Sequence, residues 1–341
     1  QLQVNPSSAD LSTGNTYYAC EIDPSNTILE GSFDLTAIAL QDYSDYDVAF
    51  YSTRTDAQLE INAVSGSNFI SEATTMYVRV EVLNQCLGVE EFDLVVNPSP
   101  LVTIDTEYTV CTNNPDLQII AEDGYDTYTW YKVDAGNKEL VVSSEQTVNI
   151  LEPGTYRLEL GWLYNNGSET CTNSKAFMVN PSNAAILSNI EIEDLQENNQ
   201  VTITATGDGN YEYAIGDIAG PYQDDPIIKN VLPGVVTIYV RDKNGCGISQ
   251  EEISVIGFPK FFSPNGDGIN ESWNLIGVDD NKEIAVSIFD RYGKLISRIN
   301  SDDQYGWNGT FNGKILPASD YWFKIHLEKG RVYKGHFTLK R

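Results

Sequence analysis

A repeated tetrapeptide divides this sequence into units of similar size. Val-Asn-Pro-Ser occurs three times, at residues 4–7, 96–99 and 179–182, so nearly equal lengths of chain separate successive copies. The second and third copies end apolar, β-rich runs at residues 92–96 and 176–179. Because proline cannot donate a hydrogen bond to a strand ladder, each copy marks the last strand of a module.

The repeat predicts five segments. We expect residues 1–7 to be the last strand of a truncated preceding module, residues 8–98, 99–182 and 183–257 to be three similar modules, and residues 258–341 to be a different terminal domain. Charge supports the last boundary. Residues 1–256 contain 9 Lys and Arg against 39 Asp and Glu, a balance of −30, whereas residues 257–341 contain 12 against 10, a balance of +2.

The pattern of apolar residues predicts an all-β chain. Short alternating runs, clearest at residues 77–82, 201–205 and 235–240, are separated by Gly, Asn, Asp and Pro, and no long helical periodicity is present. Trp130 lies between Cys111 and Cys171, which is the residue order of an immunoglobulin-type core, although at a different spacing. We therefore expect tandem immunoglobulin-like β-sandwich modules that end in a small antiparallel β-sandwich.

The five cysteines are spaced for disulfides rather than for a metal or redox site, since no pair has the short spacing of either. Cys20 with Cys86, and Cys111 with Cys171, each join an early strand to a late strand of one sandwich-sized module. We predict these two disulfides. Cys246 is then left either as a buried free thiol or as one half of an intermolecular bridge.

Composition excludes several classes of function. An acidic chain with a formal charge of −28 repels nucleic acid and anionic membranes. Its apolar runs are too short to form a transmembrane segment. We find no nucleophile motif, phosphate loop or His-rich cluster, so we expect no catalytic residues and no enzyme activity.

The terminal domain shows two predicted hairpins. Alternating apolar residues at 284–288 and 295–299 flank a turn at residues 291–294. A second alternating pair, at residues 321–327 and 333–339, flanks a turn at Lys329 and Gly330. The last of these strands brings the sequence to Arg341.

The same segment contains several motifs in a fixed order. They are Phe261-Phe262-Ser263-Pro264-Asn265-Gly266-Asp267-Gly268, Ile288-Phe289-Asp290-Arg291-Tyr292-Gly293-Lys294, Trp307-Asn308-Gly309, Asn312-Gly313-Lys314, Asp320-Tyr321-Trp322 and Lys334-Gly335-His336-Phe337-Thr338-Leu339-Lys340-Arg341. From Phe258 onward the chain closely resembles the type B sorting domain of the Bacteroidetes type IX secretion system, also called the gliding-motility-associated carboxy-terminal domain. Glu271 and Asn308 stand where that family often has Asp. More loosely, the preceding modules resemble adhesin-type repeats.

The resemblance implies a secreted protein that is held at the cell surface, attached at the outer membrane. It implies as partners the type IX translocon and a PorP/SprF-like outer-membrane protein. A terminal hairpin can also offer an edge strand to a receptor. We therefore expect recognition of the secretion signal at the end of the chain, by Lys334, Gly335, His336, Phe337, Thr338, Leu339, Lys340 and Arg341.

One loop of the terminal domain has the oxygen-rich side chains of a calcium site. Asn265, Asp267, Asn270 and Glu271 alternate with glycines in a way that can wrap a calcium ion, and the alternative is a turn in which these side chains bind their own backbone. No other cofactor is expected.

The terminal domain's histidines and tryptophans have simpler interpretations. We expect His326 and His336 to lie at the surface on neighbouring strands, without a metal or acid–base role. We expect Trp273, Trp307 and Trp322 to be core residues.

Two functions fit these features. The first is the carboxy-terminal part of a large secreted surface adhesin of the gliding-motility type, with stalk modules followed by a signal for secretion and attachment. The alternative is a set of accessory glycan-binding modules, with a sorting domain, from a secreted polysaccharide hydrolase.

Overall fold

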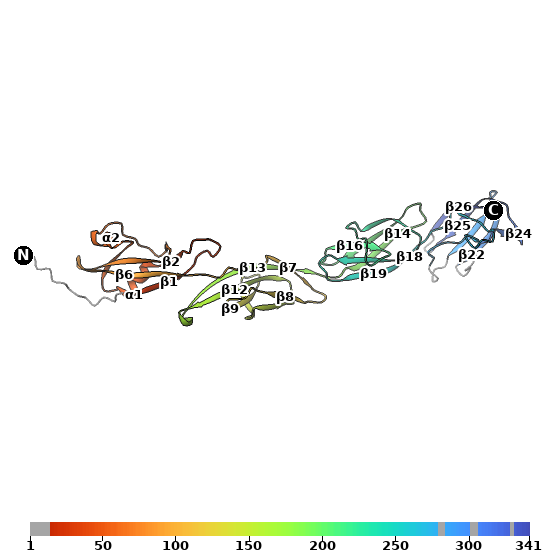
Figure 1. Cartoon of the computed structure of the whole chain (residues 1–341). Coiled ribbons are helices and arrows are strands. Elements are labelled where there is room, and N and C mark those ends of the chain that lie inside the picture. Colours follow the sequence, from red (N-terminus) through yellow and green to blue (C-terminus); the bar gives the residue numbers. More distant parts are fainter. Residues whose placement is uncertain (1–13, 279–283, 301–305, 328–330) are drawn as a thin grey trace, which may run out of the picture. The chain divides into compact units, whose positions relative to one another are not determined.

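The computed structural model describes residues 14–278, 284–300, 306–327 and 331–341 (Figure 1). Contacts divide the chain into two compact units, residues 1–110 with 116–180 and residues 111–115 with 181–341. The strand expected at residues 1–7 and the turn expected at Lys329 and Gly330 lie outside the described residues. Four hydrophobic cores are found in the described part of the chain.

Module 1 has a four-stranded sheet and a two-stranded sheet, with two short helices. Its elements are β1 (Thr16–Cys20), β2 (Gly31–Phe33), α1 (Leu35–Asp42), β3 (Asp47–Tyr51), α2 (Arg54–Leu59), β4 (Phe69–Ser71), β5 (Thr74–Val82) and β6 (Gln85–Asn97). The strand order is β1-β6-β5-β3, with β1 parallel to β6 and the other pairs antiparallel, and β2 pairs with β4. Phe33, Met76 and Phe92 belong to its core.

The two helices of module 1 were missed by sequence reasoning. Both begin at a side-chain cap, since Asp34 accepts from the N–H of Ala37 and Thr53 from that of Asp56. Both helices are too short to show a clear helical period in the sequence. Among the described residues, no helix is long and apolar enough to cross a membrane.

Module 2 has a five-stranded sheet of order β10-β9-β12-β13-β7 and a second sheet of β11 and β8. Its elements are β7 (Glu107–Cys111), β8 (Leu117–Ile120), β9 (Thr127–Val133), β10 (Glu139–Ser143), β11 (Thr147–Ile150), β12 (Gly154–Tyr164), η1 (Asn165–Gly167) and β13 (Glu169–Ser182). Trp130 is fully buried, as an immunoglobulin-type core requires. It packs edge-on against Phe177 rather than on a disulfide, and its Nε1–H donates to the Glu145 carbonyl oxygen at 2.9 Å.

Module 3 is a sandwich of two three-stranded sheets, β14-β15-β17 and β16-β18-β19. Its strands are β14 (Ile186–Glu193), β15 (Asn199–Thr206), β16 (Tyr211–Ile215), β17 (Ile227–Val231), β18 (Gly234–Asp242) and β19 (Ile248–Val255). Alternate residues of these strands, among them Val201, Ile238 and Val240, are fully buried between the sheets.

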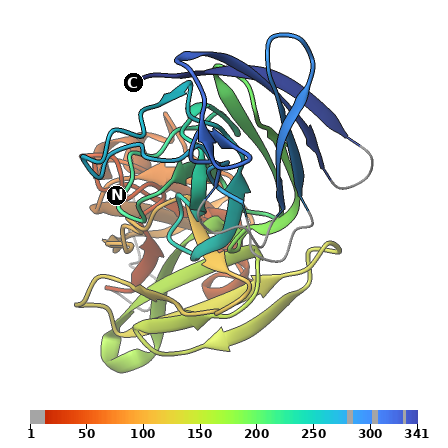
Figure 2. The ribbon, with the colours of Figure 1, turned by 90° about the vertical axis from the view of Figure 1, so that its right-hand side faces the viewer.

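The terminal domain is built on a five-stranded sheet of order β20-β26-β25-β21-β22. Its strands are β20 (Phe261–Phe262), β21 (Ala285–Phe289), β22 (Leu295–Asn300), β23 (Thr310–Phe311), β24 (Lys314–Ile315), β25 (Ser319–His326) and β26 (Val332–Leu339). Antiparallel pairing of β21 with β22 and of β25 with β26 confirms both expected hairpins. Figure 2 shows β25 and β26 side by side in the darkest blue.

Candidate functional site

A row of basic side chains crosses the solvent-facing side of the terminal sheet. Arg298 of β22 lies opposite Ser287, Ser287 lies opposite Lys324 of β25, and Lys324 lies opposite Lys334 of β26. We call Arg298, Lys324 and Lys334 the basic row. None of the ion pairs found among the described residues involves these three side chains. Like charges on one face create a positive potential that attracts an acidic partner.

An aromatic row lies beside the basic row. Phe289, Trp322 and His336 occupy the next positions on β21, β25 and β26, and the indole and imidazole centroids are 6.5 Å apart. Trp322 is 44% exposed, so the expectation that it is a core residue is wrong. Trp273 and Trp307 are buried as expected. Two open hollows, of about 700 and 680 Å³, flank Trp322.

The expected recognition residues divide between the two faces of β26. Phe337 and Leu339 are fully buried in the core, and a Cβ on Gly335 would lie 2.5 Å from the Phe323 ring. Lys334, His336 and Lys340 are exposed on the other face. Thr338, also on that face, donates its hydroxyl hydrogen to Asp320 at 2.7 Å. Only the side chains on this face of β26 are therefore accessible to a partner.

The end of the chain is tied down. Short strand β20 pairs in parallel with the end of β26, and the N–H groups of Thr338 and Lys340 donate to the carbonyl oxygens of Lys260 and Phe262, both at 2.9 Å. Arg341 donates from Nε to the Leu316 carbonyl oxygen at 3.0 Å. The expectation of a free edge strand is thus wrong for these residues, because β20 already occupies that edge.

The oxygen-rich loop binds its own backbone. Oδ1 of Asn265 accepts the N–H of Asp267 at 3.1 Å, and Oδ1 of Asp267 accepts the N–H of Ile269 at 2.8 Å. Oε1 of Glu271 accepts the N–H of Gly268 at 3.0 Å. The Asn265 amide and the Ile269 N–H lower the pKa of Asp267. These bonds are those of a side-chain-capped turn.

The remaining candidate ligands of the terminal domain do not converge on one point. The backbone carbonyl oxygen of Asn270 accepts a hydrogen bond from the N–H of Ser263 at 2.8 Å. Within the described residues, no group of three or more His, Cys, Asp or Glu is arranged to hold a metal. His326 and His336 lie opposite Val332 and Trp322, at different levels of the hairpin, and so do not face each other.

The disulfides join neighbouring modules, and the expected pairings are wrong. Cys20 of module 1 bonds Cys171 of module 2, and Cys111 of module 2 bonds Cys246 of module 3. Cys86 is the free cysteine and is exposed. Cys246, expected to be a free thiol or one half of an intermolecular bridge, is therefore bonded to a cysteine of the same chain.

Strand direction explains the error. Cys20 lies beside Asn97 at the end of β6, whereas Cys86 lies at the start of that strand. At about 3.3 Å per residue, the strand between these two positions separates the cysteines by roughly 36 Å. Likewise, Cys111 lies near Ser182 at the end of β13, whose carbonyl oxygen accepts the N–H of Thr112, whereas Cys171 lies near the start of that strand. Each first-strand cysteine is therefore at the wrong end of its own module for the expected bond.

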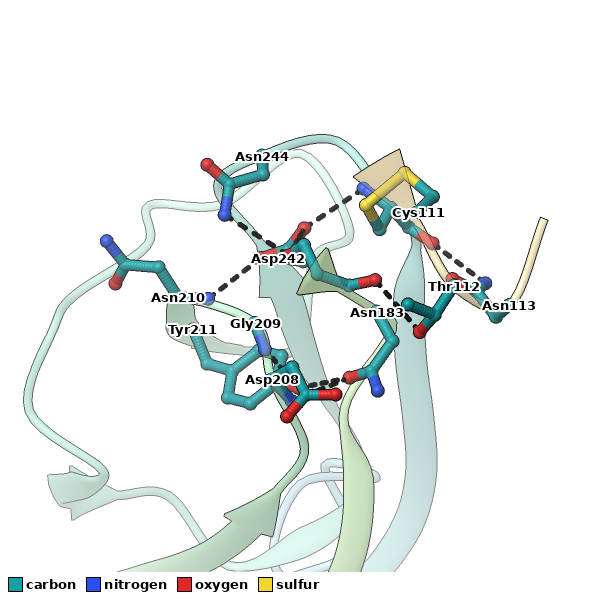
Figure 3. The surroundings of a disulfide bond; sticks show 12 residues. Cys111, Thr112, Asn113, Asn183, Asp208, Gly209, Asn210, Tyr211, Asp242 and Asn244 are labelled. Atoms are coloured by element: carbon teal, nitrogen blue, oxygen red, sulfur yellow. Dashed lines mark hydrogen bonds between the residues drawn. A yellow bond between two sulfur atoms is a disulfide. The ribbon is translucent and has the colours of Figure 1, made fainter. Parts of the chain in front are cut away.

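A buried carboxylate shapes the junction of Cys111 with Cys246 (Figure 3). Asp242 is 1% exposed and accepts three hydrogen bonds, from the Ser182 hydroxyl at 2.9 Å, the Asn210 N–H at 2.9 Å and the Cys246 N–H at 3.1 Å. Asp242 therefore fixes the loop that presents Cys246 to Cys111.

Module 3 reaches the terminal domain without a disulfide. Leu195, in the turn after β14, is 3% exposed and packs in the core of the terminal domain. Beside it, Asp194 pairs with Arg331 at 3.5 Å. The Gly257 N–H and carbonyl group exchange hydrogen bonds with Ile276, at 3.0 and 2.9 Å. Module 3 therefore supplies part of the terminal domain's core.

Comparison with known families agrees with this architecture. Residues 256–339 match the model of the CHU_C type IX secretion signal domain. The chain carries a type IX secretion signal domain. The matched segment begins at Ile256, directly after β19, the last strand of module 3. Residues 16–100 match the Flavobacterium inter-domain disulphide bond domain, and this is module 1, which bonds module 2 through Cys20. No curated protein matches the sequence.

Solved structures share only the general β-sandwich architecture. The immunoglobulin domains 1–5 of Sidekick-1 are 11% identical, with 96% of this chain and 79% of that chain covered and a TM-score of 0.26. Dimeric latent PorU from Porphyromonas gingivalis is 11% identical, with 68% of this chain and 32% of that chain covered and a TM-score of 0.21. Such low TM-scores carry no argument about function.

The signal domain and the β-sandwich modules place the chain in a functional class. A type IX signal means that the type IX secretion machinery handles this protein. The chain is thus part of a secreted, cell-surface-associated protein of the Bacteroidetes.

Proposed function

We propose that this chain is the carboxy-terminal part of a surface adhesin of the gliding-motility type. In this proposal modules 1–3 form a stalk, and the signal domain directs secretion and attaches the protein at the outer membrane. The chain has no catalytic role. The single observation that carries the proposal is the signal domain following modules joined by disulfides, an arrangement suited to resisting force and proteolysis outside the cell.

The proposed contact with the secretion machinery is the solvent-facing side of the terminal sheet. It combines the basic row with the exposed aromatic Trp322, and tryptophan and arginine are among the side chains that contribute most to protein interfaces. We place the PorP/SprF-like outer-membrane protein on this face, with Lys340 and Arg341 at its border. An acidic surface on that partner would complement the face.

Deleting the end of the chain from Val332 onward would not test this contact. That deletion removes β26, which lies between β20 and β25 in the sheet, together with Phe337 and Leu339, whose side chains are fully buried. The truncated domain would therefore fail to fold. Substitutions confined to the exposed face are required.

The test is charge reversal of the basic row by Arg298→Glu, Lys324→Glu and Lys334→Glu. We expect the triple variant to fold, to accumulate in the periplasm and to lose co-purification with the PorP/SprF-like protein. Surface display is measured by protease accessibility on intact cells. Normal display together with normal capture would contradict the proposal.

A matched control separates the effect of charges on this face from the effect of total net charge. Lys138, Lys229 and Lys314 are exposed and do not belong to the basic row; they are on module 2, module 3 and strand β24. Reversing these three charges changes the total by the same amount. The control variant should be displayed normally.

A further inference from the structure

Cys86 is a free, exposed thiol in a chain whose four other cysteines are paired. It lies next to the reversal between β5 and β6, the last hairpin of module 1, where Cys86 pairs with Glu81 in the ladder. Nothing in module 1 holds it close to Cys20, for the reason of strand direction given above. Its role must therefore be sought outside module 1.

The other modules show what a cysteine does at this position. In module 2, Cys171 lies near the reversal of the last hairpin, β12–β13, and in module 3, Cys246 lies at the reversal of the last hairpin, β18–β19. Both are bonded to a cysteine that ends the first strand of the module before. Those first-strand cysteines are Cys20 at the end of β1 and Cys111 at the end of β7. We call the first-strand positions the donor positions, and the hairpin positions of Cys171 and Cys246 the acceptor positions.

Sequence spacing supports the equivalence of the three acceptor positions. Cys86 precedes Val96 and Cys171 precedes Val179 at similar distances, and each valine opens a copy of Val-Asn-Pro-Ser. Cys246 precedes Val255, the last residue of β19, at a distance between those two.

The two donor cysteines are spaced as regularly. Cys20 follows Val4, and Cys111 follows Val96, at distances that differ by a single position, and both valines open a copy of the repeat. Donor and acceptor positions are therefore both fixed relative to the ends of the modules.

We propose that Cys86 is the acceptor half of a third inter-module disulfide. Its partner is a cysteine that ends the first strand of another module of this kind, one that precedes module 1 in the natural polypeptide. Two thiols lose two electrons and two protons as the S–S bond forms. The oxidant is a protein or small-molecule disulfide, which is reduced to two thiols by thiol–disulfide exchange.

The junction between module 3 and the signal domain has no disulfide, but it too joins the end of a first strand to the last hairpin of the following domain. Leu195 follows Val179 at the distance at which Cys20 follows Val4, so it occupies the donor position after β14, and it packs in the signal domain's core. Its neighbour Asp194 pairs with Arg331, which precedes β26 in the last hairpin of that domain. At all three junctions of this chain, the end of a first strand thus reaches the next unit. By the same rule, Cys86 is the residue of module 1 that the end of a preceding module's first strand would contact.

The test is disulfide mapping of the whole protein as the cell makes it. Cleavage after glutamate releases residues 82–90, which contain Cys86 and no other cysteine. Under non-reducing conditions we expect this peptide to be bonded to a peptide from a module preceding module 1, and to react with an alkylating reagent only after reduction.

A variant provides the matched control. Because Cys86 is exposed, Cys86→Ser should leave the fold intact and expose one new reactive thiol per chain, at the end of the preceding module's first strand. The proposal is overturned if Cys86 is alkylated without reduction, if it bonds Cys86 of a second copy, or if no cysteine stands at that position upstream.

Discussion

Truncation of the Leu195 side chain tests whether module 3 supplies part of the signal domain's core. Leu195 belongs to module 3 by sequence, yet it is 3% exposed within the signal domain's core. Leu195→Ala removes three carbon atoms, worth about 2.4 kcal/mol of transfer free energy at about 0.8 kcal/mol per methylene group. A cavity adds to this loss, and buried Leu→Ala changes cost about 2–5 kcal/mol in total. We therefore expect the signal domain to lose about 3 kcal/mol.

Backbone strain does not complicate this substitution. Leu195 has a φ of +59°, in the left-handed region, and alanine keeps the Cβ atom, so the cost of this conformation is the same in both proteins. The exposed Leu232, at 79%, provides a control in the same module. Leu232→Ala should change the free energy of unfolding by less than about 0.5 kcal/mol.

Hydrogen exchange measured by mass spectrometry on the whole chain reads this change in the signal domain alone. The slowest amides of β25 and β26 report its global opening. At about 1.4 kcal/mol per factor of ten, a loss of about 3 kcal/mol accelerates their exchange roughly 100-fold. Less than a threefold acceleration in Leu195→Ala would refute the claim that module 3 supplies part of this core.

Three further perturbations have defined outcomes. Asp242→Ala should lower the free energy of unfolding of module 3 by roughly 2–3 kcal/mol in urea unfolding, because three donors lose their acceptor and two of them, on Ser182 and Cys246, are buried. Gly335→Ala should lower the free energy of unfolding of the signal domain by about 1–3 kcal/mol, because its Cβ would lie 2.5 Å from the buried Phe323 ring and one of the two must shift. Gly88→Ala, with open space around its Cβ, should be tolerated. Burial raises the pKa of Glu90 in the folded protein above its ordinary 4.5, so protonation of Glu90 stabilises module 1. This stabilisation is fully present below pH 4.5 and is lost as the pH rises through the raised pKa. Glu90→Gln should therefore raise the melting temperature of module 1 at pH 8 more than at pH 4, and equal changes would contradict this.

Local sequence patterns were enough to predict the all-β fold and both terminal hairpins. Strict alternation at Ile284, Val286 and Ile288 specifies one buried face, and turn residues fix where the chain reverses. The capped turn at residues 265–271 was one of two alternatives, because alternating Asn and Asp oxygens suit a backbone as well as an ion.

The disulfide pairing could not be obtained from spacing within modules. Each pair was expected to close one module, but the first strand of module 1 pairs in parallel with the last, which separates Cys20 from Cys86. A signal was nevertheless present, since Cys20 and Cys111 follow the repeat at nearly equal distances. Leu195 stands at the same distance after the repeat as Cys20, but an apolar residue after a strand does not reveal which core it enters.

The most direct test of the central claim is transport of a foreign passenger. Residues 183–341, which keep Leu195 with the signal domain, are fused to a folded reporter protein and expressed in a Bacteroidetes cell with a type IX system. We measure the fraction of reporter that protease digests on intact cells, with residues 183–255 alone as the control. The account predicts that the complete fusion is displayed and the control is retained in the periplasm. Retention of the folded complete fusion would contradict it.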